Sequence, residues 1–325
     1  MKVGLDVMGG DFAPKATIMG AILAHKELPS TVRIVLIGDE KVILKSLQEE
    51  NADPANFDIV HASEVIEMGE HPTKALVRKP NSSISIGFNM LQNKEIDAFS
   101  SAGSSGAMMV GSVYSVGTIE GILRPCTAAI LPSEDGGSAI LLDVGTIVDV
   151  KPEILYQLAI LGQLYAHYVY KVENPKVGLL NIGSEEGKGN LVCQTAFPLM
   201  KDSVDFNFIG NIESRDLLKG KADVIVCDGF TGNILLKNME AMYRIIKKRG
   251  VNDDYFERFN YENFGGIPLL GINGSVVVGH GISNDIAIKN MIVLAHDIHV
   301  SELSVKIKDA LSKIANSTIR DEQVF

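Results

Sequence analysis

The sequence has no tryptophan, few aromatic residues and only three cysteines, and each shortage narrows the class of protein. Aromatic side chains make up 6% of 325 residues, and the cysteines stand far apart at positions 126, 193 and 227. Three widely spaced cysteines do not form a disulfide framework, and Cys126 and Cys227 lie in strand-like apolar runs. We therefore expect reduced core thiols in a reducing cytosol.

Long apolar runs and excess positive charge are also missing. No apolar run approaches the roughly 18 residues of a transmembrane helix, and the amino terminus has none of the regions of a secretion signal. The chain carries 30 Lys and Arg against 40 Asp and Glu, for a net charge of −10. This balance argues against nucleic acid as a partner and requires any acidic protein partner to dock on a local basic patch.

Glycine is plentiful, and it follows strand-like segments. Six such segments end in glycine-rich polar turns, which occupy residues 8–11, 100–106, 143–145, 181–190, 228–233 and 279–281. In a parallel sheet all carboxyl ends share one edge, so we expect these turns to gather along one crevice. Backbone N–H groups in such turns attract anions. The pattern predicts an enzyme for a phosphate-bearing or otherwise anionic substrate.

Strand and helix patterns alternate along the whole chain, which predicts an α/β fold with a mainly parallel twisted sheet and helices on both faces. We expect one domain over residues 1–325, and Asn174-Pro175 marks the best position for a boundary between lobes. Pro14, Pro72 and Pro152 stand where helices could start. The expected strands are 2–7, 32–37, 57–60, 96–100, 126–131, 138–143, 176–181, 205–209, 223–227 and 275–278. The expected helices are 14–27, 39–50, 81–93, 105–117, 152–170, 188–201, 231–249, 283–299 and 301–316.

Two glycine-rich segments resemble nucleotide-binding motifs without matching them. Gly183–Gly189 is one residue short of a P-loop and has Gly189 where Ser or Thr should follow the lysine. Gly9-Gly10-Asp11 replaces the dinucleotide fingerprint after the first strand, so NAD binding has no positive support. Ser101–Ala107 is a stronger candidate, because hydroxyls and consecutive N–H groups at a helix start can hold phosphate. A serine-capped tight turn explains the same residues equally well.

Cationic and imidazole side chains cluster in a few places, and each has two interpretations. On a helix, Lys74 and Arg78 share a face that could hold an anion, or they form a solvated flank. His280 in its glycine turn is either catalytic or turn-forming. Residues 234–249 form a helix with one apolar face, expected to be buried, and Lys247, Lys248 and Arg249 at its end are either a solvated terminus or a docking site. His296 and His299 lack a third metal ligand nearby.

Together these segments resemble the bacterial phosphate acyltransferase family, whose members convert an acyl-acyl-carrier protein and inorganic phosphate to acyl phosphate for phospholipid synthesis. The match spans nearly the full length in the expected order. It comprises Asp6–Pro14, Glu70–Lys79, Ser101–Met108, Leu142–Gly145 with Asp149, Val177–Asn190, Phe208–Asp216, Asp223–Lys237 and Phe264–Gly274 with Gly279-His280-Gly281. Ser104-Ser105, Thr146-Ile147 and Ser214 depart from the usual residues, and the segment between Lys237 and Phe264 is shorter than usual.

The resemblance implies a fold similar to isocitrate and isopropylmalate dehydrogenases and a homodimer that needs neither metal nor organic cofactor. It further implies a cytoplasmic enzyme that associates weakly with the inner face of the membrane or with a membrane acyltransferase. Ser104, Ser105 and Gly106 would cradle phosphate, and Asn190, Asp228, Thr231 and Asn233 would also bind the phosphate or the oxyanion. Lys188, His71 and His280 are the implied catalytic side chains. The carrier protein would dock on Lys247, Lys248 and Arg249, or on Lys74 and Arg78.

Two alternatives stay open from the sequence. One is a nicotinamide-dependent dehydrogenase on a similar fold, which would need an adenosine-binding pattern and metal-binding aspartates. The other is a non-catalytic binder of acyl-carrier protein, in which the departures at Ser104-Ser105 and Thr146-Ile147 mark lost activity. Detection of acyl phosphate as its hydroxamate would separate the enzyme from both alternatives.

Overall fold

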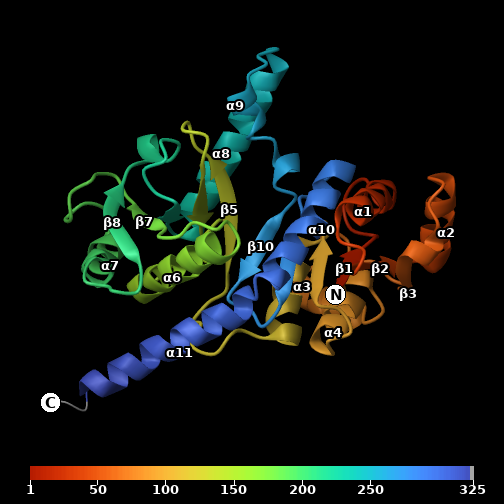
Figure 1. Ribbon diagram of the computed structural model, residues 1–325, viewed down its shortest axis with the longest axis horizontal. Helices are drawn as coiled ribbons and strands as arrows, with labels where there is room; N and C mark the ends of the chain where they lie inside the picture. Colours follow the sequence, from red (N-terminus) through yellow and green to blue (C-terminus); the bar gives the residue numbers. More distant parts are fainter. Residues whose placement is uncertain (323–325) are drawn as a thin grey trace. The chain divides into compact units, whose positions relative to one another are not determined.

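The chain folds into two compact units, each built around its own group of strands (Figure 1). The computed structural model describes residues 1–322, and the surroundings of side chains through residue 314. The first unit contains residues 1–117 and 261–300, and the second contains residues 118–260 and the described residues from 301 onward. Residue 174, where the sequence favoured a boundary, lies inside the second unit. The α/β class predicted from the alternating pattern is confirmed.

The first unit contains six strands in the order β3-β2-β1-β4-β11-β10. Their bounds are β1 Lys2–Asp6, β2 Arg33–Gly38, β3 Phe57–His61, β4 Ala98–Ser101, β10 Ile267–Leu270 and β11 Ser275–Val278. All neighbours are parallel except β10, which pairs antiparallel to β11 through Ile267 and Val278. The carboxyl ends of β1, β4 and β11 therefore lie side by side at one edge of the sheet.

Helices cover both faces of this sheet. They are α1 Lys15–Glu27, α2 Glu40–Glu49, α3 Pro72–Arg78, α4 Ser83–Gln92, α5 Ser105–Gly111 and α10 Asp285–Val300. Val35 and Ile37, two residues apart on β2, point to the same face of the sheet as Phe99 on β4, and all three pack with residues of α4. A Cβ atom at Gly87 of α4 would lie 2.3 Å from the Phe99 ring, so glycine allows this close approach. On the opposite face, Ile34 and Leu36 are also buried, where α1 and α10 pack together.

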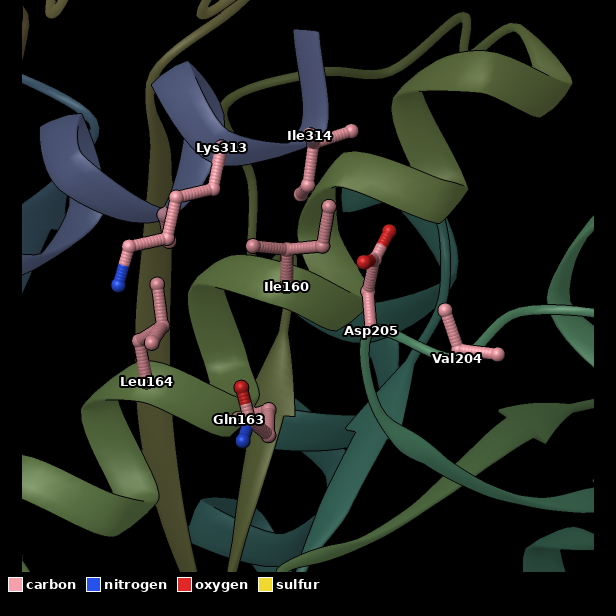
Figure 2. Close-up of a pocket in the computed structure, with 8 residues that line it drawn as sticks. Ile160, Gln163, Leu164, Val204, Asp205, Lys313 and Ile314 are labelled. Carbon is pink, nitrogen blue, oxygen red and sulfur yellow. The ribbon is translucent and has the colours of Figure 1, made fainter. Parts of the chain in front are cut away.

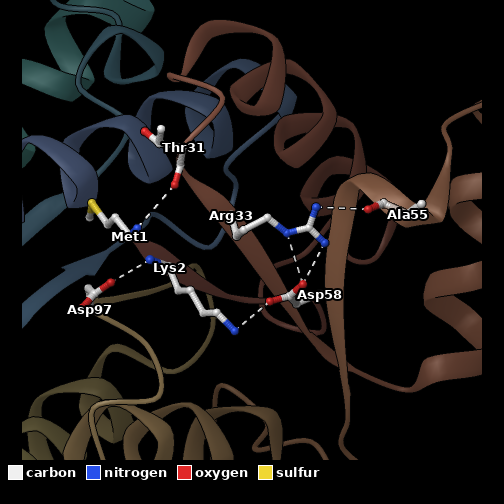
Figure 3. Close-up of polar contacts among 7 residues, drawn as sticks. All are labelled: Met1, Lys2, Thr31, Arg33, Ala55, Asp58 and Asp97. Atoms are coloured by element: carbon white, nitrogen blue, oxygen red, sulfur yellow. Dashed lines mark hydrogen bonds and ion pairs between the residues drawn. The ribbon is translucent and has the colours of Figure 1, made fainter.

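Ion pairs and hydrogen bonds join the starts of the strands at the opposite edge of the first unit (Figure 3). Asp58 of β3 accepts hydrogen bonds from Arg33 of β2, at 2.7 Å from Nη2, and lies 3.0 Å from the Lys2 ammonium. The Lys2 backbone N–H also donates to Asp97, at 2.7 Å. The Arg33 guanidinium beside Asp58 lowers the pKa of that carboxyl. These contacts hold β1, β2 and β3 in register far from the glycine-rich turns.

The second unit contains five strands in the order β5-β6-β9-β7-β8. Their bounds are β5 Cys126–Pro132, β6 Ser138–Leu142, β7 Lys176–Leu180, β8 Asn207–Ile212 and β9 Val224–Val226. Strands β6, β9, β7 and β8 are parallel, and β5 forms an antiparallel pair with β6. The helices are α6 Pro152–Tyr168, α7 Leu191–Lys201, α8 Gly229–Lys248, α9 Asp254–Glu257 and α11 Leu303–Glu322. Helix α6 packs on the sheet, where a Cβ atom at Gly162 would lie 2.4 Å from Leu142 and Val224.

Most predicted elements are confirmed within a few residues, and four details differ. Strand β10 and the short helix α9 were not expected. Pro72 and Pro152 each occupy the first helical position, whereas Pro14 is the residue before α1. The apolar face of α8 is only half-buried at Leu235, Met239 and Ile246 and is exposed at Met242, and among the residues described in full the buried ones of this helix are Gly229 and Gly232. Within residues 1–322, no helix is long and apolar enough to cross a membrane.

Candidate functional site

Three loops meet where β1, β4 and β11 end in the first unit. The Asp11 N–H donates to the Gly281 carbonyl at 2.7 Å, and the Gly279 N–H donates to the Ser101 carbonyl at 2.8 Å. A Cβ atom at Gly9 would lie 2.6 Å from the Gly103 nitrogen, so glycine lets the first two loops close on each other. Three of the six predicted turns thus come together at one sheet edge.

Asp6, at the end of β1, is buried under these loops with only 1% of its surface exposed. One carboxylate oxygen accepts from the Ser101 hydroxyl at 2.6 Å, and the other accepts from the Met8 N–H at 3.0 Å. The Ser101 hydroxyl in turn accepts from the Gly103 N–H at 2.9 Å. Burial raises the pKa of Asp6, and the hydrogen bond from Ser101 is the largest opposing effect. Asp6 therefore fixes the shape of the β1 and β4 loops.

The predicted phosphate cradle lies at the start of α5, against the start of α3. Ser104 is buried and caps α5 by accepting from the Ala107 N–H at 3.3 Å, whereas Ser105 is exposed. A Cβ atom at Gly106 would lie 2.6 Å from the Pro72 ring, which brings the two helix starts into contact. Helix α5 continues into a π-helical segment, Ser112–Val116. First-turn N–H groups of two adjoining helices favour an anion at this surface.

The structure places both candidate histidines of the first unit on the surface. His71 precedes Pro72 at the start of α3, beside the Ser104–Gly106 turn, and its side chain makes no capping hydrogen bond. His280 lies in the loop after β11, where the Ile282 N–H donates to its Nδ1 at 3.4 Å and its ring centre is 5.9 Å from that of Tyr261. A Cβ atom at Gly281 would lie 2.6 Å from Met68, so the loop that holds His280 approaches the segment before His71.

Helix α3 also carries the predicted cationic face. Lys74 and Arg78 are both exposed on it. Lys79, directly after the helix, is bound to Glu70 at 2.5 Å and to the Val65 carbonyl at 2.7 Å. The Lys79 ammonium lowers the pKa of Glu70. Lys79 therefore anchors the segment before α3, and Lys74 and Arg78 supply the exposed positive charge near His71.

In the second unit, the turns after β6, β7, β8 and β9 surround a pocket of about 750 Å³. Its lining mixes apolar side chains with amides, hydroxyls and carboxylates. The lining residues are Val148, Asp149, Val150, Leu155, Leu179, Leu180, Asn181, Ile182, Gly189, Asn190, Val192, Cys193, Glu213, Ser214, Cys227, Asp228, Thr231 and Leu235. We call this space the strand-end pocket.

Two of its polar residues also cap helices. Asn190 accepts from the Cys193 N–H at 2.9 Å at the start of α7. Asp228 accepts from the Thr231 N–H and hydroxyl, both at 2.8 Å, at the start of α8. The structure thus gathers the candidates Asn190, Asp228 and Thr231 in one pocket. The other two candidates of this unit, Lys188 and Asn233, are exposed and lie outside the described lining.

Asp143 organises the loop beside the strand-end pocket, and sequence reasoning did not single it out as a site residue. It is fully buried, and one carboxylate oxygen accepts from the Thr127 N–H, the Thr127 hydroxyl and the Val144 N–H at 2.8–2.9 Å. The other oxygen accepts from the N–H groups of Thr146 and Ile147, at 2.8 and 2.6 Å. The available signal was an aspartate directly after a buried strand and two residues before a glycine.

Two glycines of α8 fit against this loop. A Cβ atom at Gly232 would lie 1.9 Å from the Asp143 carbonyl oxygen, and one at Gly229 would lie 2.5 Å from its carboxylate. The buried Cys227 thiol lies 3.7 Å from the same carbonyl oxygen, and burial raises its pKa well above the ordinary value. Cys126 is also buried, as the sequence predicted, and its pKa is raised for the same reason.

The basic run at the end of α8 is exposed, as expected for a docking surface or a solvated terminus. Lys247 pairs with Glu257 of α9 at 2.6 Å, and Lys248 and Arg249 lie beside it. The Lys247 ammonium and the Tyr243 hydroxyl lower the pKa of Glu257. The sequence did not show this pair, because α9 was not expected. Part of the positive charge of the run is therefore matched within the second unit.

A second cavity of the second unit, about 420 Å³, lies between α6, α11 and the segment before β8 (Figure 2). Its walls are largely aliphatic, with Ile160 and Leu164 on α6 and Ile314 on α11. Asp205, Gln163 and Lys313 add polar groups at its sides. It contains none of the predicted site residues.

This chain is similar, in sequence or in fold, to several known proteins. Residues 1–251 match a family described as "Fatty acid synthesis protein". A phosphate acyltransferase of Dictyoglomus turgidum is 41% identical to this chain, over 97% of the chain and 99% of that protein. A phosphotransacetylase of Streptococcus pyogenes has a TM-score of 0.63 at 16% identity, covering 92% of this chain and 94% of its own. A 4-hydroxythreonine-4-phosphate dehydrogenase of Burkholderia phymatum has a TM-score of 0.51 at 15% identity, covering 95% and 97%.

Proposed function

We propose a mechanism from one premise, which the full-length sequence identity establishes: this chain belongs to the phosphate acyltransferase family. It is an enzyme that transfers an acyl group to phosphate and serves fatty acid and phospholipid synthesis. The observation that carries this conclusion is 41% identity over 97% of the chain. We further propose that the acyl donor is an acyl-acyl-carrier protein, the thioester that fatty acid synthesis provides.

The reaction needs alignment and charge stabilisation more than a strong base. A phosphate oxygen attacks the thioester carbonyl carbon, the C–S bond breaks, and the thiolate leaves and takes up a proton. Inorganic phosphate is already an anion at neutral pH, so it can attack the thioester directly without a strong base, and this direct attack needs no covalent acyl-enzyme. The protein must hold phosphate near the carbonyl and stabilise the oxyanion that forms.

The first unit supplies the proposed phosphate site. Ser104, Ser105 and Gly106 lie at the start of α5, in contact with the start of α3, and both helix starts favour negative charge. His71, beside this turn, or His280, in the loop after β11, would protonate or orient the leaving thiol. Lys74 and Arg78 on α3 would raise the local concentration of phosphate.

The second unit supplies the remaining proposed contacts. Asn190 and Thr231 line the strand-end pocket, and Asp228 orients the Thr231 hydroxyl through its 2.8 Å hydrogen bond. Lys188 lies on the exposed turn after β7, where its side chain packs closely against Gly183, and it would contribute positive charge. Asn233, which borders Gly145, would add a polar contact. No metal or organic cofactor enters this scheme.

Several features beyond the chemistry are also proposed. The likeness to the 4-hydroxythreonine-4-phosphate dehydrogenase supports a fold related to isocitrate and isopropylmalate dehydrogenases. The family resemblance supports a homodimer in the cytoplasm, in weak contact with the inner face of the membrane or with a membrane acyltransferase. Exposed apolar residues on α8, including Phe230, Ile234 and Met242, are consistent with a partner surface there.

Carrier-protein docking is proposed for one of two basic surfaces. Changing Lys247, Lys248 and Arg249 to Glu should raise the KM for the acyl-carrier protein, and added salt should weaken wild-type binding in the same way. The matched variant Lys74→Glu/Arg78→Glu tests the alternative and leaves Lys79 in its bond to Glu70. Unchanged carrier-protein kinetics in both folded variants would place docking elsewhere.

The direct test is trapping of acyl phosphate as its hydroxamate. We expect purified protein to form it from hexadecanoyl-acyl-carrier protein and phosphate without added metal. No hydroxamate at saturating phosphate would refute the activity and favour a non-catalytic binder. A shift of the melting temperature with NAD or NADP would instead support the dehydrogenase alternative.

A further inference from the structure

The strand-end pocket has a charge that does not suit phosphate. Three carboxylates, those of Asp149, Glu213 and Asp228, line it. Among the described lining residues there is no Lys, Arg or His. Arg215 pairs with Glu213 at 2.7 Å, whereas none of the described ion pairs involves Asp149 or Asp228, so an anion that enters this space still meets like charge, which disfavours it. The pocket therefore suits a neutral part of a substrate.

Its deepest walls are apolar and well packed. Leu155, Leu180 and Cys227 are 1%, 8% and 4% exposed and present small apolar surfaces to the pocket, whereas Leu179 is 0% exposed and presents none. Val192 and Leu235, on α7 and α8, are half-buried and form the sides, whereas Ile182 is 81% exposed at the rim. The carboxylates lie on half-buried or exposed residues, nearer the solvent. A ligand would thus meet polar groups at the entrance and aliphatic groups at the far end.

The volume suits a flexible chain of many carbon atoms. Small-molecule pockets range over roughly 300–1,000 Å³, and this one measures about 750 Å³. Each methylene group buried from water favours binding by about fourfold, so an apolar pocket of this depth discriminates chains by length. Chains that reach the buried floor gain more than chains that stop at the rim.

We propose that the strand-end pocket binds the acyl chain of the substrate, with the methyl end against Leu155, Leu180 and Cys227, and that it sets the preferred chain length. This inference rests on the proposed function, because it assigns one part of the acyl donor to one place in the second unit.

The experiment compares two leucines of α8. Leu235 lines the pocket, whereas its neighbour Leu236 is similarly half-buried and lies outside the described lining. Leu235→Trp should fill part of the pocket, and Leu236→Trp adds the same bulk to the same helix. We expect the ratio of kcat/KM for hexadecanoyl over octanoyl donors to fall at least tenfold in Leu235→Trp. In Leu236→Trp it should change less than twofold. An unchanged ratio in folded Leu235→Trp overturns the proposal.

A second measurement does not depend on turnover. Cys193 is the half-buried thiol of the pocket, whereas Cys126 and Cys227 are buried. We expect hexadecanoate to slow alkylation of Cys193 by N-ethylmaleimide at least threefold and octanoate to slow it less, with Cys193→Ser identifying the reacting thiol. Equal alkylation rates with and without hexadecanoate overturn the proposal. If wild-type protein forms no hydroxamate from either donor, the proposed function fails, and this assay still decides the pocket.

Discussion

The two units each bury one aspartate at the end of a strand, and they treat that carboxylate differently. Asp143 in the second unit accepts from four backbone N–H groups and one hydroxyl. Asp6 in the first unit accepts from the Ser101 hydroxyl and the Met8 N–H. Both residues are at most 1% exposed. The aspartate that follows or ends a buried strand thus accepts five described hydrogen bonds in the second unit and two in the first.

This difference explains how each loop region is built. Burial penalises a charged carboxylate unless hydrogen bonds compensate for lost water. The loop after β6 turns its own N–H groups inward onto Asp143, and it leaves carboxylates and aliphatic groups to line the strand-end pocket. In the first unit, burial raises the pKa of Asp6 despite the hydrogen bonds that oppose this shift. In our proposal the first unit binds the anion, and the second unit binds the neutral chain.

The largest effect is expected at Asp143. Asp143→Asn exchanges one carboxylate oxygen for an NH₂ group, so two N–H donors, such as those of Thr146 and Ile147, lose their acceptor. Hydrogen bonds to charged groups contribute about 1.5–3 kcal/mol each, so the free energy of unfolding should fall by about 3 kcal/mol or more. Urea denaturation measures this loss. A loss below about 1 kcal/mol would show that the donors of this loop find other partners.

The next effect separates phosphate binding from chain binding. Ser104→Ala/Ser105→Ala should raise the apparent KM for phosphate about tenfold or more, because each lost hydrogen bond to an anion costs roughly 1.5–3 kcal/mol. The preference between hexadecanoyl and octanoyl donors should stay as in wild type. Ser115→Ala, in the π-helical segment after α5, is the matched control. Unchanged phosphate dependence in the folded double variant would assign the Ser104–Gly106 turn to structure alone.

A smaller, pH-dependent effect is expected at Asp6. Its pKa in the folded protein is raised above the unfolded value, so the folded state binds the extra proton between these two pKa values. Stability from this group is therefore present at low pH and is lost as pH rises through the folded pKa. Asn cannot ionise, so the unfolding free energy of Asp6→Asn relative to wild type should become more favourable as pH rises from about 4.

Urea titrations of wild type and Asp6→Asn across this pH range measure that difference. Asp143→Asn serves as the comparison, because its loss of hydrogen bonds should make it much less stable than wild type at neutral pH. A constant difference between wild type and Asp6→Asn at all pH values would contradict the raised pKa of Asp6.

The smallest effect is expected at Asp58, on the edge of the first unit away from the loops (Figure 3). Its pairs with Arg33 and Lys2 are partly exposed, so Asp58→Asn should cost about 0.2–1 kcal/mol for each pair. The folded pKa of Asp58 is lowered, so its contribution is present above the unfolded pKa and is lost as pH falls through the folded pKa. A double-mutant cycle with Arg33→Gln measures the coupling, which should shrink in high salt.

Much of the fold could be predicted because the relevant signals are local. Buried parallel strands such as β2 and β7 are continuous apolar runs, and glycine-rich turns with Ser, Asp or Asn follow them at helix starts. The same local rules located the turns at 100–106, 181–190 and 228–233, from which Ser104, Asn190 and Asp228 cap α5, α7 and α8. Strand β10 escaped prediction because Pro268 weakens its strand pattern, and its pairing partner β11 supplies the missing context.

The sequence by itself determined the α/β alternation, the positions of the strand ends and the polar turns that follow them, because each depends on side chains a few residues apart. Only the tertiary structure decided which turns share a unit, that the apolar face of α8 is only partly buried, and that Asp143 reaches Thr127 across the antiparallel β5–β6 pair. Those features depend on contacts between residues distant in sequence. Their free energy comes from burial and hydrogen bonding that local patterns do not encode.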